Sequence, residues 1–455
     1  MKSSKRKICQ VLALVVSGMG ASVAMAAGPL IQGGGSSLVA PTIGASANPN
    51  VTPPVTASGE LGLFGSSNAS FTYFSVGSGA GQNAFLNNQP TYLGAGVTGT
   101  VNFANSDAAL TTAQVASYNA STIGANSGPL IQIPYIVTAI TVPVVNGPAV
   151  TSANTPQTTP GQAHSIALND DDLCGIFSGK LTNWNQVTNP EGGLYSTNAP
   201  IKVIYRSDSS GTTELLTRHL AAVCTAGNTA TGVKFVDSLT FANTTAFPAG
   251  VPGNFIGASG SGPIVNGVVT GVRGSLASLS SAGVAAVAYL SPDYTNTFLA
   301  SQSSVVTSSG ALQLPVASLY NSTNGVYYAP TYANATTALG TIAAPSNPAD
   351  PNAWVPVSGP NYAALANPKA GYPVSGTSQI ILSQCYANPT VASNVQSFLN
   401  NHYTNASYAS VVHGNGFDTV PSSFRTAISA NFLSNSSGNG LDIGDAGNCS
   451  LYTGR

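Results

Sequence analysis

The sequence predicts an α/β protein whose sheets are parallel. Short apolar stretches rich in β-branched residues alternate along the chain with segments of helical periodicity, which is the pattern of β-α units. Four of the apolar stretches end in turns made of Gly, Ser, Thr or Asp. Ligands of open α/β folds bind at the carboxyl ends of strands, so these four turns are the candidate ligand-binding loops.

The composition narrows the class of protein further. The chain has 455 residues, enough for two or three domains or for one two-lobed protein. Only 6% of its residues are charged, against about a quarter in a typical domain, whereas 43% are hydrophobic. This composition excludes the highly charged class of disordered chains. It offers no basic patch for a phosphodiester backbone, so we expect no nucleic-acid partner.

The N-terminus has the pattern of a secretory signal peptide over residues 1–26. A basic segment, an apolar core and a small-residue cleavage pattern follow one another: Lys2, Lys5, Arg6 and Lys7, then Ile8 to Val16, then Ala24-Met25-Ala26. We therefore expect a mature chain that begins near Ala27 and is periplasmic or secreted. Cleavage removes four of the 13 Lys and Arg and none of the 14 Asp and Glu, which leaves nine against 14 and a net charge of −5. No later apolar run is long enough to span a membrane.

Four cysteines remain after such a cleavage: Cys174, Cys224, Cys385 and Cys449. An even number in an exported protein predicts two disulfides. Three pairings are possible, and we favour Cys174–Cys224 with Cys385–Cys449 because each closes within one region of the chain. No CxxC spacing occurs, so a zinc or redox centre is disfavoured and we expect neither a metal nor a cofactor.

The first three ligand-binding turns follow predicted strands in the N-terminal part of the chain. The strands and their turns are Leu30–Gln32 with Gly33–Pro41, Phe71–Phe74 with Ser75–Gly81, and Val101–Ser106 with Asp107. We expect helices after the last two turns, from Gln82 to Asn87 and from Thr111 onward. Each turn is weak evidence alone, since Gly77-x-Gly79-x-Gly81 lacks the spacing of a dinucleotide-binding motif.

Residues 130–146 predict two buried strands broken at Pro134 and Pro143. Beyond a polar loop, Ser165 to Gly179 predicts a helix capped by Asn169 or Asp170. The acidic run of residues 170–172 resembles part of a metal site. Acids are favoured in a first helical turn, however, and no further ligands are spaced nearby, so we assign the run a structural role.

The fourth turn lies within Ile201–Leu220 and is the most informative stretch of the chain. Residues 201–205 predict a buried strand, and residues 214–220 predict a helix. The Ser, Asp, Gly and Thr residues between them place free backbone N–H groups at a helix N-terminus, which is a ready anion site. Arg206 adds a charged fork suited to a tetrahedral oxyanion. The alternative is an ordinary N-capping loop with a surface arginine.

The remainder of the chain is less strongly patterned. Strands are expected at Val284–Leu290 and Gln379–Cys385, and a helix at Val391–Tyr403. Residues 294–370 are rich in Asn, Thr, Pro, Ala and Tyr, and we interpret them as an elaborated surface region. The Gly-, Ser- and Asn-rich tail from residue 433 is anchored through Cys449.

The four turns, in this order, resemble those of the periplasmic phosphate-binding proteins of phosphate ABC transporters, the PstS-like family, and the related DING-type phosphate binders. The resemblance rests on GGGSSLVAP (33–41), SVGSGAG (75–81), NFANSDAAL (102–110), DDLCGIFSGKLTNWNQV (171–187) and IYRSDSSGTTELLTRHL (204–220). It covers most of the mature chain, thinly over residues 225–370.

This resemblance implies a two-lobed fold of the type II periplasmic-binding-protein class, with a hinge and a ligand cleft between the lobes. The boundaries we expect are residues 27–137 for the first part of lobe I, 138–371 for lobe II with the elaborated region, and 372–455 for the return of lobe I and the tail. A monomer is expected.

The resemblance also implies the phosphate ligands, position by position. Lobe I would contribute the Ser37 hydroxyl, the Leu38 backbone N–H, the Ser78 hydroxyl and the Asp107 carboxylate. Lobe II would contribute the Arg206 fork, with the helix N-terminus at Ser210, Gly211 and Thr212, and Asp208 would orient Arg206. The family usually has Thr-Phe where this chain has Ser37-Leu38, so the hydroxyl is kept and the aromatic ring is lost.

The function we expect is capture of inorganic phosphate for uptake or scavenging, with the membrane permease of a phosphate ABC transporter as partner. An acceptor-only carboxylate such as Asp107 discriminates against sulfate, because sulfate has no proton to share. A secreted DING-type phosphatase is the alternative, although the four histidines are scattered and neither Ser209 nor Ser210 has an identifiable base. A third reading, a structural or adhesive surface protein, rests on the low charge and the richness in Asn, Ser and Thr.

Overall fold

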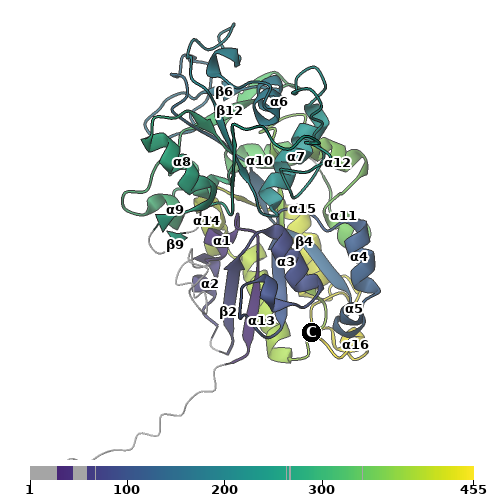
Figure 1. The fold of residues 1–455 in the computed structure, drawn as a ribbon. Coiled ribbons are helices and arrows are strands. Elements are labelled where there is room, and N and C mark those ends of the chain that lie inside the picture. The colour runs from purple at the N-terminus through teal and green to yellow at the C-terminus, as the bar shows by residue number, and fades with distance from the viewer. Residues whose placement is uncertain (1–27, 45–58, 67, 263, 266–267, 341) are drawn as a thin grey trace, which may run out of the picture.

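The computed structural model describes residues 28–44, 59–66, 68–262, 264–265, 268–340 and 342–455. The expected signal peptide and the cleavage site at Ala27 lie outside these residues. Two sheets, each covered by helices, are stacked end to end and form two lobes (Figure 1). The first lobe is the lower one in this view.

The sheet of the first lobe contains six strands among the described residues. Their order across the sheet is β15 (Asp418–Thr419), β4 (Leu130–Ala139), β14 (Ser375–Ser383), β3 (Val101–Ser106), β1 (Leu30–Gly35) and β2 (Ser70–Ser75). Strands β1, β2 and β3 are parallel, whereas β14 runs antiparallel to both β3 and β4. Consequently β1, β2 and β3 end at the same edge of the sheet, the edge that faces the second lobe.

The sheet of the second lobe is also mixed. Its strands run in the order β13 (Val326–Tyr328), β12 (Val316–Asn321), β5 (Val142–Val145), β11 (Ala286–Val287), β7 (Lys202–Arg206) and β8 (Phe255–Ala258), and β6 (Ala167–Leu168) pairs with β12. A separate hairpin consists of β9 (Ile264–Val265) and β10 (Val268–Val269). Strands β7, β8 and β11 are parallel, so β7 and β8 deliver their carboxyl ends to one place.

Helices cover both sheets and also lie between the lobes. Those of the first lobe are α1 (Ala40–Ile43), α2 (Gly59–Phe64), α3 (Ser78–Leu86), α4 (Thr112–Asn119), α5 (Thr122–Ser127), α13 (Pro389–Thr404), α14 (Ala406–Gly414), α15 (Ser422–Ile428) and α16 (Ala446–Cys449). Those of the second lobe are α6 (Asp170–Ser178), α7 (Gly211–Val223), α8 (Gly271–Ser281) and α9 (Ser304–Thr307). Single 3₁₀ or π turns occur at Pro90–Tyr92, Trp184–Gln186, Pro292–Tyr294 and Ser429–Leu433.

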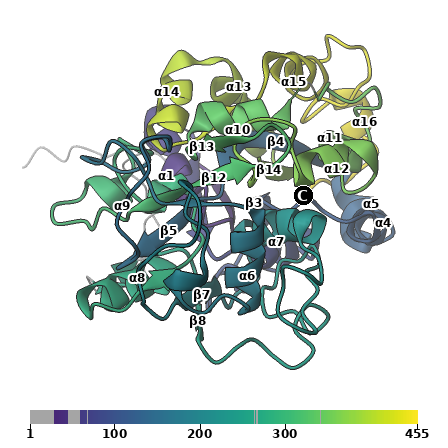
Figure 2. The same cartoon turned by 90° about the horizontal axis from the view of Figure 1, so that it is seen from above.

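Three helices lie where the lobes meet: α10 (Tyr332–Leu339), α11 (Pro351–Trp354) and α12 (Gly359–Ala366). Figure 2 shows them between the teal elements of the second lobe and the yellow C-terminal helices. Helices α10 and α11 pack against β4 of the first lobe, whereas α12 packs against α7 of the second. No helix in the described part of the chain has the length and apolar character needed to cross a membrane.

The chain crosses between the lobes along two neighbouring segments. It leaves the first lobe after β4 at residues 140–141 and returns just before β14, and the N–H of Ile140 donates to the carbonyl of Val374 at 2.8 Å. Strands β4 and β14 therefore run in opposite directions, which makes the first sheet mixed. In the second sheet β5 runs antiparallel to β11 and β12, so neither sheet is parallel as the sequence predicted. A single cluster of buried apolar side chains continues across both lobes.

Other expectations about the chain need correction. Strand β4 continues through Pro134, where a bulge in the pairing with β14 accommodates this residue, and Pro143 lies inside β5, so neither predicted break occurs at its proline; the two strands are separated at residues 140–141. Residues 294–370 are not only surface elaboration, because β12 is a nearly fully buried strand paired with β5. The tail is anchored by more than Cys449, since the Arg455 guanidinium donates to the carbonyls of Val101 and Phe85 at 2.6 and 2.9 Å.

The two disulfides and the acidic helix start agree with the sequence predictions. Cys174 is bonded to Cys224 and Cys385 to Cys449, the favoured pairing. Helix α6 is capped by Asn169, whose side chain accepts from the N–H of Asp172 at 2.9 Å while the Asp172 carboxylate accepts from the N–H of Asn169. Asp172 thus completes the cap of α6, in keeping with the structural role assigned to the acidic run, whereas Asp170 bonds to His219 and Asp171 to Asn228.

Candidate functional site

Loops from both lobes converge where the two sheets face each other. The first lobe contributes the loops that follow β1, β2 and β3, which carry Ser36 to Leu38, Ser78 and Asp107. The second lobe contributes Arg206 at the end of β7, the loop from Ser207 to Ser210 that leads to α7, and the segment after β8, which carries Ser261. Contacts across this junction bring the side chains into one site.

Asp107 is the carboxylate at the centre of this site and is 2% exposed. Its Oδ1 accepts hydrogen bonds from the hydroxyls of Ser36 at 2.6 Å and Ser378 at 2.8 Å. Its Oδ2 has a single long contact, 3.5 Å, with the hydroxyl of Ser78. Burial raises the pKa of Asp107, and the hydroxyl donors and the charge of Arg206 oppose that rise.

Arg206 supplies the positive charge of the site and is 1% exposed. Its Nε and Nη2 donate to the two oxygens of Asp208 at 2.7 and 2.5 Å, a bidentate pair that fixes the plane of the guanidinium. The N–H of Gly260 also donates to Asp208, at 2.9 Å. Burial disfavours both charges, but the hydrogen bonds and the charge attraction between Arg206 and Asp208 outweigh this effect. The pKa of Arg206 is therefore raised and that of Asp208 is lowered.

The third nitrogen of the Arg206 guanidinium, Nη1, connects the two lobes. Nη1 of Arg206 donates to the hydroxyl of Ser37 at 3.2 Å and to that of Ser261 at 3.0 Å, and these hydroxyls lie 2.9 Å apart. Ser37 belongs to the first lobe, whereas Arg206 and Ser261 belong to the second. The Tyr294 hydroxyl, also from the second lobe, donates to the carbonyl of Ser37 at 3.1 Å. The lobes are therefore in contact at the site.

Two helix N-termini point into the site from opposite lobes. Helix α3 starts at Ser78, and α7 starts at Gly211 with Ser210 as its cap, whose hydroxyl accepts from the N–H of Thr213 at 3.3 Å. The first N–H groups of a helix have no acceptor within it and carry partial positive charge. Within the described residues, the buried hydroxyl oxygen of Thr212 has no hydrogen-bond partner. These donors suit an anion.

Gly211 shows how closely the lobes approach. A Cβ at this position would lie 2.6 Å from the Cβ of Asp107 and 2.6 Å from the hydroxyl oxygen of Ser78. Only glycine fits here, because both neighbouring atoms belong to the opposite lobe. The N–H of Gly79 in α3 also donates across the junction, to the carbonyl of Ser209 at 3.3 Å.

Contacts at the lobe junction join six of the residues expected from the sequence, Ser37, Ser78, Asp107, Arg206, Asp208 and Gly211, and the other three, Leu38, Ser210 and Thr212, are their neighbours in the chain. One backbone group is already used: the N–H of Leu38 donates to the hydroxyl of Ser36 at 3.1 Å. The sequence reasoning missed Ser36, Ser261 and Ser378. Ser261 follows an apolar strand in a Gly- and Ser-rich turn, so the signal that revealed the other four turns could have revealed this one. For Ser378, inside a returning strand, no local signal exists.

This arrangement can bind a small tetrahedral oxyanion. The groups around it are neutral donors, one guanidinium and one carboxylate, and hydrogen bonds to an ion are strong in a site shielded from water. A carboxylate oxygen accepts but cannot donate, so it can hydrogen-bond to an anion only where that anion carries a proton.

No histidine belongs to this site among the residues that the structure describes. The four histidines make their hydrogen bonds away from the site: His164 with Thr155, His219 with Asp170 and Ala366, His402 with Glu60 and Tyr135, and His413 with Asp418. Among the residues that the structure describes, no three His, Cys, Asp or Glu side chains are grouped to hold a metal ion.

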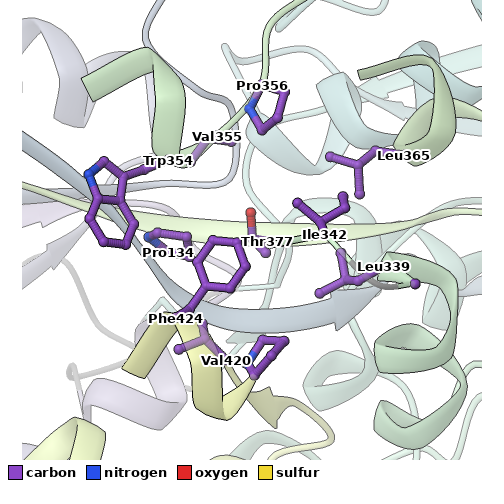
Figure 3. Close-up of a pocket in the computed structure, with 12 residues that line it drawn as sticks. Pro134, Leu339, Ile342, Trp354, Val355, Pro356, Leu365, Thr377, Val420 and Phe424 are labelled. Atoms are coloured by element: carbon purple, nitrogen blue, oxygen red, sulfur yellow. The ribbon is translucent and has the colours of Figure 1, made fainter. Parts of the chain in front are cut away.

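An apolar pocket is separate from this site. It is lined by Pro134, Leu339, Trp354, Leu365 and Phe424, among others, and Thr377 of β14 faces it (Figure 3). Successive side chains of a strand point to opposite faces. The next residue, Ser378, accordingly reaches Asp107, and the pocket lies across β14 from the anion site.

Comparisons with known proteins bear on this site. A family model described as a PBP superfamily domain matches residues 25–341. The chain is 36% identical over 294 residues to alkaline phosphatase L of Pseudomonas aeruginosa PAO1, covering 64% of this chain and 63% of that protein, so it spans less than two thirds of that relative. It is 33% identical over 295 residues to a phosphate-binding protein of an unknown prokaryotic organism, covering 63% of this chain and 67% of that protein.

The fold is similar to that of a solved high-affinity periplasmic phosphate-binding protein, PfluDING, bound with phosphate at pH 8.5. The TM-score is 0.71 and the sequence identity 31%, and the match covers 93% of this chain and 99% of the other.

Proposed function

This chain belongs to the PBP superfamily, and we propose that it binds inorganic phosphate between its two lobes as an exported solute-binding protein. The observation that supports this most is the contact of Arg206 with Ser37 across the lobe junction, next to the buried Asp107 and the N-terminus of α7. The relatives named for phosphate binding support the choice of anion.

The ligands in this proposal come from both lobes. Ser37, Leu38, Ser78 and Asp107 contact phosphate from the first lobe, with Leu38 releasing its N–H from Ser36 as the ligand enters. Arg206, Ser210, Gly211 and Thr212 contact it from the second lobe, and Asp208 holds Arg206 in place. Asp107 accepts the hydrogen bond of the phosphate proton, which sulfate lacks.

Titration calorimetry of the mature protein tests this function. We expect phosphate binding that excess sulfate barely displaces, with a preference of at least about tenfold, because a lone pair set against a buried carboxylate leaves a polar group unpaired. Equal affinities for the two anions would refute the role of Asp107, and the absence of phosphate binding would refute the function.

The second candidate function is phosphomonoester hydrolysis, which the name of the alkaline phosphatase L relative favours. The site argues against it, since the Ser210 hydroxyl caps α7 and the described histidines bond elsewhere. Turnover of p-nitrophenyl phosphate by the purified protein, abolished by Ser210→Ala, would favour the enzyme instead.

The cellular setting completes the proposal. The resemblance to transporter-associated phosphate binders supports a monomer that is periplasmic or secreted and delivers phosphate to the permease of an ABC transporter. We propose residues 27–137 and 372–455 as lobe I and 138–371 as lobe II; β4 carries the sheet of the first lobe on to Ala139, and α10 and α11 pack on that sheet.

A further inference from the structure

The two oxygens of Asp107 have different surroundings. Oδ1 accepts from Ser36 and Ser378 at 2.6 and 2.8 Å, whereas Oδ2 has only the 3.5 Å contact with Ser78. Oδ1 therefore accepts two short hydrogen bonds from hydroxyls of the protein, and Oδ2 has no short hydrogen bond from the described residues. All three serines are at most 1% exposed.

Ser378 differs from the residues that the proposed function assigns to the anion. It lies on β14, the strand that returns from the second lobe, and next to it Gln379 pairs with Ser106 of β3, the residue before Asp107. Since its hydroxyl donates to Asp107 Oδ1, its proton is not available to an anion. Ser378 thus acts through Asp107.

We propose that Ser378, assisted by Ser36, is a positioning residue that keeps Asp107 ionised and turned as an acceptor, and thereby sets the preference of the site for a protonated oxyanion over sulfate. This inference rests on the proposed function, because it concerns the selectivity of the same site.

Removal of the Ser378 hydroxyl should lower the selectivity of the site, because two opposing influences set the pKa of Asp107. Burial raises the pKa of this carboxyl, and the hydrogen bonds from Ser36 and Ser378 lower it. Without Ser378, Asp107 takes up a proton at higher pH. A protonated carboxyl can donate a hydrogen bond, so it accommodates sulfate, and the discrimination falls.

Other charged or titratable groups face Asp107, and separate variants test how their titration affects binding. Arg206 of the β7–α7 loop favours the ionised form, and Tyr73 of β2 has a pKa raised well above its usual value by burial, with Asp107 adding to the rise. Glu214 of α7 and Asp293 of the Pro292–Tyr294 turn are buried carboxyls whose pKa values burial also raises. The variants Glu214→Gln and Asp293→Asn separate their titration from that of Asp107.

The experiment measures phosphate and sulfate affinities by calorimetry from pH 5 to pH 8. The variants are Ser378→Ala, Ser378→Thr, which keeps the hydroxyl, and Thr377→Ala as the matched control. Thr377 is the neighbour of Ser378 on the same strand, but its side chain faces the apolar pocket (Figure 3). Circular dichroism confirms that each variant is folded.

In wild type we expect the ratio of phosphate to sulfate affinity to fall as the pH decreases. In Ser378→Ala the midpoint of that fall moves to higher pH by about one pH unit, so at a pH below both midpoints the ratio is about tenfold lower than in wild type, as expected for the loss of one hydrogen bond to a charged group. Ser378→Thr and Thr377→Ala retain the wild-type profile, as do Glu214→Gln and Asp293→Asn.

The outcomes separate this inference from the function on which it rests. A wild-type protein that binds no phosphate would overturn both. Phosphate binding with an unchanged ratio and pH profile in Ser378→Ala would overturn the role of Ser378 alone. Should Ser378→Ala fail to fold, Ser36→Ala, which removes the other Oδ1 donor, must show the same shift toward higher pH.

Discussion

At the scale of single residues, the site depends on a buried charge that a carboxylate holds on one side and neutral hydroxyls contact on the other. Asp208 occupies two nitrogens of Arg206 and leaves Nη1 facing Ser37 and Ser261. The guanidinium of Arg206 is therefore already oriented before a ligand binds. A preorganised donor binds an anion without the entropic cost of ordering its side chain.

Replacing Arg206 with Ala should therefore weaken phosphate binding severely. It should also lower the free energy of unfolding by about 3–5 kcal/mol, since Asp208 remains largely buried without its partner. Arg206→Lys should be almost as damaging to binding, because an ammonium cannot hold Asp208 through two parallel bonds. Calorimetry and urea unfolding measure the two effects, and a nearly unchanged dissociation constant in Arg206→Ala would exclude the proposed fork.

The same pair predicts how stability changes with pH. The pKa of Asp208 is lowered in the folded state by Arg206, which outweighs the effect of burial. Asp208 makes its full contribution to the free energy of unfolding above its pKa in the unfolded chain, about 3.9. This contribution is lost as the pH falls through the lower pKa of the folded state. Urea unfolding between pH 2 and pH 6 should show this loss in wild type and not in Asp208→Asn. An identical pH dependence in both proteins would contradict it.

At the scale of elements, α7 joins the binding function to the stability of the second lobe. Its N-terminus holds Ser210, Gly211 and Thr212 at the site, and its C-cap, Cys224, is tied to Cys174 of α6. The two ends of this 13-residue helix have separate tasks, because a dipole acts mainly within the first and last turns.

Removing this disulfide by Cys174→Ser and Cys224→Ser together should cost about 2–5 kcal/mol of stability. Phosphate affinity should change little, since the bond lies at the end of α7 opposite to the ligand. Urea unfolding and calorimetry of the double variant measure both quantities. Removal of the other disulfide, Cys385–Cys449, serves as the comparison, and a large loss of affinity specific to the α7 variant would contradict this division of tasks.

At the scale of the whole molecule, the local sequence patterns identified the loops but not the path of the returning chain. Ser78, Asp107 and Arg206 could be predicted because each follows a strand at a polar turn, and that signal is local. Ser378 could not, because its role depends on the pairing of β14 with β3, about 270 positions apart in the chain. The antiparallel direction of β14 and the burial of β12 were missed for the same reason.

Closure of the lobes can be tested at Gly211. The variant Gly211→Ala places a methyl group against Asp107 and Ser78 of the opposite lobe, so the lobes cannot approach fully. We expect a loss of phosphate affinity of about tenfold to a hundredfold, in keeping with the cost of overpacking. Gly253→Ala is the matched control, as a Cβ there meets nothing within 4 Å. Calorimetry showing equal affinities in the two variants would argue against a closed binding state.

The most direct measurement is a crystal structure of the mature protein with phosphate. Phosphate oxygens should lie within hydrogen-bond distance of Ser37 or Ser78 in the first lobe, of Arg206 and the N-terminus of α7 in the second, and of Oδ2 of Asp107. A phosphate held by one lobe alone, or bound away from the junction of the lobes, would contradict the account.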